Sequence, residues 1–178
     1  MSGIEKEARH VMRSVDERDI QTILVPYDFS AHAAAALRSA AELAEQLSAR
    51  LHLLHVLEEP TVTYPSVATG VVTPGGLPVE IRDSAQAALE EIASGIEAGA
   101  EPVTARVIEA PSVAPGILEL AREIEADLIV MGTHGRTGMQ HAFLGSVAER
   151  TLRQAECPVL TLRPPDPVEA AAVAEQGA

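Results

Sequence analysis

Five short runs rich in branched apolar residues constrain the fold more than any other feature of the sequence. They span residues 22–28, 51–57, 103–110, 126–132 and 157–163. The first run, TILVPYD, shows no alternation of apolar and polar residues, which is typical of a strand that is buried on both faces. Strands of this kind occur in parallel sheets with helices on each side, so the runs predict such a sheet.

Segments with helical periodicity separate the five runs. We expect helices over about 31–48, 79–98 and 145–154, and another that begins at Ser112 or at the Ala114-Pro115 pair. Ser30 can cap the first helix, and Gly99 is placed to end the second. The alternation predicts an α/β fold: an open, doubly wound, five-stranded parallel sheet with right-handed crossovers and strand order 3-2-1-4-5.

The remaining segments divide the chain into one domain with two appendages. Residues 1–20 form an N-terminal arm with apolar residues at helical spacing, residues 21–164 form the domain, and residues 165–178 form a flexible tail rich in Pro and Ala. Within the domain, residues 58–79 lack a sustained period and are rich in Pro and Gly, so they predict a long loop.

Charge and composition exclude several classes of protein. The formal net charge is −13, which argues against nucleic-acid binding, and no apolar run reaches the ~18 residues of a membrane span. Cys157 is the only cysteine, so no internal disulfide can form, and we expect it to be a small buried hydrophobe. His52 and His55 should face opposite sides of a strand, which is poor metal-site geometry. We expect a cytoplasmic protein without a metal centre of its own.

A glycine motif follows the fourth apolar run. Gly132, Gly135, Gly145 and Ser146 give the spacing G-x2-G-x9-G-S. The glycines let the backbone approach a ligand, and the start of the helix at 145 offers free N–H groups to phosphate oxygens. With strand order 3-2-1-4-5, Asp28 at the end of the first strand should lie beside this motif. Walker and dinucleotide-binding patterns are absent.

The sequence resembles the universal stress protein family over about residues 22–163. The resemblance rests on ILVPYDFS, ADLIVMGTHGRTG, GSVAERTL and CPVLTLR, and the unbroken glycine motif is similar to the ATP-binding branch. It implies an ATP site with Mg²⁺ bridging the phosphates, and a homodimer through the fifth strand, Val159–Arg163. It implies these ligand contacts: Pro26, Tyr27 and Asp28 at adenine and ribose, Val56 at adenine, Met131 and Gly132 at ribose, and Thr133, His134, Gly135, Gly145, Ser146 and Val147 at the phosphates. Arg136 could add a local cation.

The resemblance also implies a role: nucleotide-dependent regulation of a stress response through an unknown protein partner. Two alternatives stay open, an interaction module that binds no nucleotide and a slow ATPase that uses His134 or Asp28. No positioned base or arginine finger is evident, so we expect at most weak hydrolysis and name no catalytic residue. Asp28 could instead only cap the turn that follows it, and the glycine motif could be an empty connector.

Overall fold

The computed structural model describes residues 20–59, 78–98, 101–133 and 144–163. The N-terminal arm, most of the 58–79 loop and the tail lie outside these residues. The strands are β1 (Thr22–Pro26), β2 (Arg50–Glu58), β3 (Thr104–Ala110), β4 (Leu128–Gly132) and β5 (Val159–Leu162). The helices are α2 (Ala31–Leu47), α3 (Val79–Ser94), α4 (Val113–Glu123) and α5 (Ser146–Gln154).

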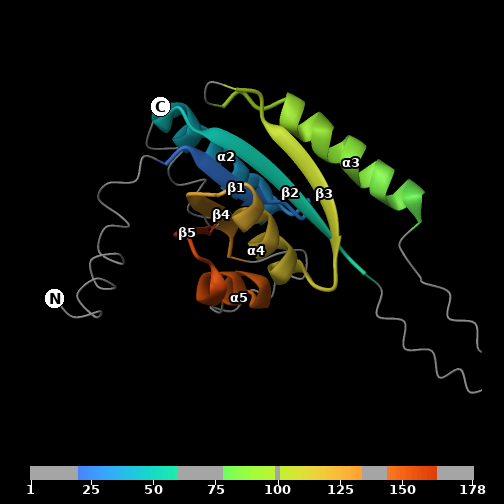
Figure 1. Cartoon of the computed structure of the whole chain (residues 1–178). Coiled ribbons are helices and arrows are strands. Elements are labelled where there is room, and N and C mark those ends of the chain that lie inside the picture. The colour runs from blue at the N-terminus through green and yellow to red at the C-terminus, as the bar shows by residue number, and fades with distance from the viewer. Residues whose placement is uncertain (1–19, 60–77, 99–100, 134–143, 164–178) are drawn as a thin grey trace, which may run out of the picture.

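The five strands form one parallel sheet in the order β3-β2-β1-β4-β5, which confirms the predicted topology. Helices cover both faces, and Figure 1 shows α4 and α5 together on one side of the sheet. The helices α2 and α3 pack on the opposite face. The sheet is therefore the middle layer of three.

The central strand β1 explains why the apolar runs lack polar alternation. Ile23 and Val25 belong to the core beneath α2 and α3, whereas Leu24, between them, belongs to the core beneath α4 and α5. All three side chains are fully buried. Successive residues of a strand point to opposite faces, so a strand covered on both sides needs apolar residues at every position.

The ends of the helices agree with the sequence except at α3. Ser30 caps α2 by accepting a hydrogen bond from the Ala33 N–H at 3.1 Å, and Ser112 is the N-cap residue directly before α4. The prediction that α3 ends at Gly99 is wrong, because the helix ends at Ser94 with Gly95 as its cap. The N–H groups of Gly95 and Ile96 bond three residues back, which tightens the last turn.

The prediction for Cys157 is also wrong in part. Cys157 is half-buried and packs at the margin of the core beneath α4 and α5, and β5 begins two residues later, at Val159. Because β5 lies at the edge of the sheet, its neighbours cover it less completely than they cover a central strand.

The other edge strand, β3, is covered by a side chain of α3. The amide of Gln86 donates to the Ala105 carbonyl oxygen at 3.0 Å and accepts from the Val107 N–H at 2.9 Å. This pair of bonds takes the place of a neighbouring strand, which blocks edge-to-edge pairing at β3. Among the described residues, β5 pairs only with β4 and has no such cover.

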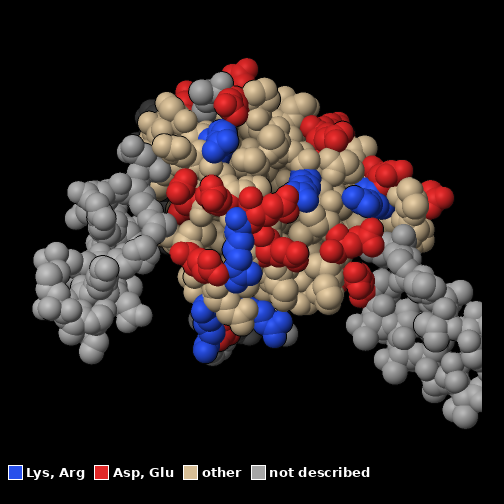
Figure 2. Space-filling model, in the orientation of Figure 1, with Lys and Arg blue, Asp and Glu red and all other residues tan. Residues whose placement is uncertain are grey.

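The surface is predominantly acidic, as the net charge requires. On the face drawn in Figure 2, acidic side chains form a band across the middle, and basic ones gather at the lower end, where α5 lies in Figure 1. The two arginines of α5 are Arg150 and Arg153. No helix within the described ranges has the length and apolar character needed to span a bilayer.

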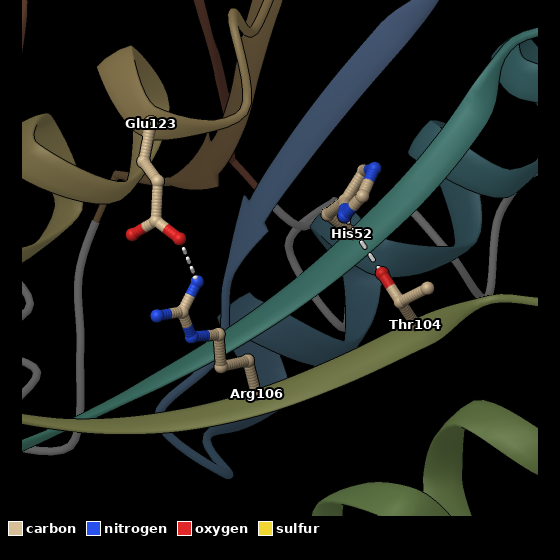
Figure 3. A network of polar contacts seen from close by, with 4 residues as sticks. All are labelled: His52, Thr104, Arg106 and Glu123. Carbon is tan, nitrogen blue, oxygen red and sulfur yellow. Dashed lines mark hydrogen bonds and ion pairs between the residues drawn. The ribbon is translucent and has the colours of Figure 1, made fainter.

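Polar contacts join β2, β3 and α4 on the face of the sheet that α4 covers (Figure 3). Arg106 on β3 forms an ion pair with Glu123 on α4 at 2.6 Å, and the Thr104 hydroxyl lies 2.7 Å from His52 Nδ1. The ion pair is half exposed, so it contributes little to stability. His52 is partly buried, and this burial, together with the Arg50 charge, lowers its pKa below the usual 6.5, although Glu101 opposes the shift.

The lowered pKa of His52 predicts a loss of stability in mild acid. As the pH decreases, the unfolded chain binds a proton at His52 near pH 6.5, whereas the folded chain binds it only at a lower pH. The free energy of unfolding should therefore fall as the pH decreases from about 6.5 towards the folded-state pKa. Replacing His52 by glutamine should flatten this part of the profile. Urea unfolding of both proteins between pH 7 and pH 5 measures the difference, and identical slopes would contradict the prediction.

Candidate functional site

The site begins where the order of the strands reverses. β1 pairs with β2 on one side and with β4 on the other. The chain runs from β1 through β2 to β3 at one edge and then crosses to β4 and β5 on the other side, so the order reverses between β1 and β4. In open parallel sheets, ligands bind at this point, beyond the carboxyl ends of the strands. The ends of β1 and β4, at Pro26 and Gly132, are therefore where a ligand site is expected.

A cavity of about 440 Å³ lies at this point. Ten of the thirteen predicted ligand residues line it, and they come from the ends of β1, β2 and β4 and from the start of α5: Pro26, Tyr27, Asp28, Val56, Met131, Gly132, Thr133, Gly145, Ser146 and Val147. The other three, His134, Gly135 and Arg136, lie outside the described residues. The sequence thus identified residues that line one cavity although up to about 120 positions separate them. Their contact with a ligand stays a prediction.

At the end of β1, a tight turn fixes the direction of Asp28. Its Oδ1 accepts a hydrogen bond from the Ser30 N–H at 3.1 Å, so Asp28 caps this turn and also lines the cavity. Phe29, between them, has a φ of 63°, a left-handed conformation that is unfavourable for an aromatic residue. Such strain persists where the surroundings impose it, most often at functional sites.

Aromatic contacts hold this turn against β2. The Phe29 ring lies edge-on to Tyr27 at 5.4 Å and to His55 at 4.8 Å, measured between ring centroids. His55 Nδ1 lies 2.7 Å from the Tyr27 carbonyl oxygen. Burial, and next the Asp28 charge, raise the pKa of the Tyr27 hydroxyl, with Arg38 opposing the shift. Tyr27 therefore keeps its proton at neutral pH and can act as a hydrogen-bond donor.

At the other end of the cavity, the described residues offer backbone groups and no charged side chain. The Gly145 N–H donates to the Thr133 carbonyl oxygen at 2.8 Å, which brings the two ends of the glycine motif together. Gly145 is also the residue that precedes α5, and it has no side chain to accept a bond from the first turn. The N–H groups at the start of α5 therefore remain suited to an anion.

Gly132 also has a packing role that the sequence did not suggest. A Cβ at this position would meet the Cβ of His32 at 3.0 Å and the His32 backbone at 3.1 and 3.2 Å, so the first turn of α2 would have to give way. The expectation that its missing Cβ makes room for a sugar stays a prediction. The Gly132 backbone lines the cavity.

Seven residues line the cavity without having been predicted: Ala33, Leu54, His55, Leu57, Glu58, Val113 and Ala148. Most are apolar and belong to ordinary strand or helix positions, which carry no functional signal. Glu58 is different, because it is an acid at the end of an apolar run, as Asp28 is, and it forms the last residue of β2. This shared position could have identified it, but the sequence placed it at the start of a long loop.

The described lining of the cavity combines acidic groups with apolar walls. Its charged groups are the acids Asp28 and Glu58, and it contains no lysine or arginine. Within the described ranges, no three His, Cys, Asp or Glu side chains gather to hold a metal ion. The arrangement offers hydrogen-bond acceptors at one end, N–H donors at the other and apolar walls between them, as in a site for a small polar molecule.

Comparison with known proteins identifies the family. The model of the Universal stress protein family matches residues 19–163. The chain belongs to this family. It is 36% identical over 147 residues to universal stress protein YxiE of Bacillus subtilis, covering 79% of this chain and 97% of the relative. It is 31% identical over 144 residues to universal stress protein MJ0531 of Methanocaldococcus jannaschii, covering 80% and 82%.

Solved structures share the fold. Hypothetical protein MJ0577 of Methanocaldococcus jannaschii superposes with a TM-score of 0.64 at 26% identity, covering 82% of this chain and 97% of that one. A universal stress protein solved in complex with cAMP gives 0.57 at 23% identity, covering 81% and 97%. One from Archaeoglobus fulgidus, in complex with dAMP, gives 0.55 at 24% identity, covering 81% and 98%. At these identities, the last two establish the fold alone.

Proposed function

We propose that this universal stress protein binds ATP in the cavity at the ends of β1, β2 and β4. The observation that carries the proposal is that ten of the predicted ligand residues line one cavity. The base and ribose would lie near Pro26, Tyr27, Asp28, Val56, Met131 and Gly132. The phosphates would lie at the glycine motif, with Thr133, His134, Gly135, Arg136, Gly145, Ser146 and Val147.

Three properties of the cavity support a nucleotide as the ligand. Its volume, about 440 Å³, lies in the range of small-molecule sites. Its apolar wall, which includes Val56 and Met131, suits the faces of a base. The start of α5 presents backbone N–H groups, which can hold phosphates in a protein with a net charge of −13. The cAMP and dAMP complexes of relatives with this fold make adenine nucleotides the first ligands to test.

The nucleotide would act as a regulatory ligand in the cytoplasm. A ligand shifts a protein between states by as much as its affinities for them differ, so bound ATP would favour one form of the surface that an unknown protein partner recognises. Hydrolysis would be slow, since the sequence shows no evident positioned base or arginine finger, and Mg²⁺ would bind through the phosphates. Steady ATP turnover that His134→Ala abolishes would instead indicate an ATPase.

Thermal unfolding at increasing ATP concentration tests the proposal. A ligand that binds only the folded state adds RT ln(1+[L]/Kd) to stability, about 2.7 kcal/mol at a hundred times the Kd. We expect the midpoint temperature to rise steadily with ATP, and CTP at the same ionic strength serves as the control. A midpoint that millimolar ATP leaves unchanged would refute ATP binding and favour an interaction module without nucleotide.

We also propose a homodimer through the fifth strand, Val159–Arg163. The apolar side chain of Leu160 on β5 is 40% exposed, and the Gln86 amide covers the opposite edge of the sheet. An uncovered apolar edge strand is a ready surface for pairing with a second copy. Sedimentation should therefore give a dimer for the wild type and a monomer for Leu160→Lys. A wild-type monomer at high concentration would contradict the proposal.

A further inference from the structure

The cavity has two electrically different ends. Near β1 and β2 it contains two carboxylates, Asp28 and Glu58. Near β4 and α5 the described lining has no carboxylate and instead offers the positive end of the α5 dipole. A ligand that fits both ends needs hydrogen-bond donors at one end and negative charge at the other. This distribution of charge favours a nucleotide whose nucleoside lies at the carboxylates and whose phosphates lie at the start of α5.

Glu58 is the carboxylate that the family motif does not include. It is the last residue of β2, and its Oε1 accepts a hydrogen bond from the Val113 N–H, the first residue of α4, at 3.3 Å. This bond fixes one oxygen of the carboxylate beside the cavity that Glu58 lines. Val56, two residues earlier, points to the same face of the strand and also lines the cavity.

A carboxylate at this position discriminates between ligands by charge and by hydrogen bonding. An ionised carboxylate only accepts hydrogen bonds, so it favours an amine or hydroxyl and disfavours a carbonyl oxygen or a phosphate. A second, adjoining cavity of about 580 Å³ between α4 and α5 is also lined by Glu58. Glu149, Arg150 and Arg153 line that second cavity as well, so its charge is mixed, and the selectivity assigned to Glu58 concerns the first cavity.

We propose that Glu58 is a specificity-determining residue of the nucleotide site: its carboxylate accepts a hydrogen bond from a donor on the nucleoside. The inference rests on the proposed nucleotide site. Two donors qualify, the exocyclic amine of adenine and a ribose hydroxyl. Acids at the end of a second strand hold ribose hydroxyls in dinucleotide-binding folds, whereas the position of Val56 favours the base.

The competing explanation is that Glu58 only caps α4. An anion at the start of a helix stabilises it, and the bond to the Val113 N–H has this effect. Glu58→Gln separates the two roles, because the amide oxygen can keep the bond to Val113 while the charge is lost. The amide can also donate to a 6-oxo group, which the carboxylate cannot. A purely capping role would change stability and leave ligand preference as it was.

Isothermal titration with four nucleotides tests the proposal. ATP is compared with ITP, which lacks the base amine, and with 2′-deoxyATP and 3′-deoxyATP, which each lack one ribose hydroxyl. We expect the wild type to prefer ATP over at least one analogue by on the order of tenfold, as the loss of a hydrogen bond to a charged group implies. In Glu58→Gln the same ratio should fall to about threefold or less. The analogue whose ratio changes identifies the donor: ITP indicates the base amine, and each deoxyATP indicates the ribose hydroxyl that it lacks.

The matched control is Glu59→Gln, which removes the same charge from the adjacent exposed residue, outside the described lining of either cavity. It should keep the wild-type ratios. Unchanged ratios in Glu58→Gln, or equal loss of preference in both variants, would overturn the role of Glu58. A wild type that binds ATP and all analogues equally would overturn it as well. A wild type that binds none of the four would instead refute the proposed function itself.

Discussion

Replacing Gly145 by aspartate should abolish ATP binding without unfolding the protein. Gly145 precedes α5 with a φ of −61° and a ψ of 149°, which any residue adopts without strain. Aspartate is a favourable residue at this position, because its carboxylate accepts hydrogen bonds from the first turn of the helix. That carboxylate would occupy the N–H groups proposed for the phosphates and repel them. We expect the affinity for ATP to fall at least about a hundredfold, as measured by titration calorimetry.

The matched control is Gly145→Asn, which has nearly the same shape and capping ability without the charge. It should weaken ATP binding less than Gly145→Asp does, and both variants should unfold at or slightly above the wild-type temperature. Adenosine, which has no phosphate, should bind all three proteins alike. If Gly145→Asp binds ATP as tightly as the wild type, the phosphates do not lie at α5.

Replacing Gly132 by alanine should destabilise the fold by about 1–3 kcal/mol, the usual cost of forcing a methyl group into a packed interior. The added Cβ would lie 3.0 Å from His32 Cβ and 3.1 Å from the His32 carbonyl carbon. Backbone atoms cannot move aside as the end of a side chain can, so the first turn of α2 would have to shift. Urea unfolding measures the loss.

Gly95→Ala is the matched control for this substitution. A Cβ at Gly95 would meet only the Ile92 and Glu91 carbonyl oxygens at 3.6 and 3.8 Å, which is ordinary contact, and its φ of −86° suits alanine. Its stability should stay within about 0.5 kcal/mol of the wild type or rise slightly. Equal stability of Gly132→Ala and Gly95→Ala would show that α2 can retreat from β4 at no cost.

The sheet could be predicted from the sequence because its physical cause is local. A strand covered on both faces needs apolar residues throughout, and the run at 22–28 has this pattern. The glycine motif and Asp28 then located the cavity, since neighbouring strand ends meet at one edge of a parallel sheet. Ten predicted residues line that cavity for this reason.

Other features depend on packing that the sequence does not display. Gly95 and Gly99 are both plausible helix ends, and α3 ends at Ser94 with Gly95 as its cap, after which Ile96 and Ala98 pack into the core. The crowding at Gly132 comes from His32, a neighbour a hundred positions away. Glu58 was missed because the sequence assigned it to the long loop, whereas the structure makes it the last residue of β2, beside α4 and the cavity.

The central claim is that the cavity between β1 and β4 binds ATP through the start of α5. Calorimetric titration of the wild-type protein with ATP, run in parallel with Gly145→Asp, tests it most directly. We predict a single saturable binding event for the wild type that disappears in the variant. The absence of saturable heat for the wild type up to millimolar ATP, or identical isotherms for the two proteins, would contradict the claim.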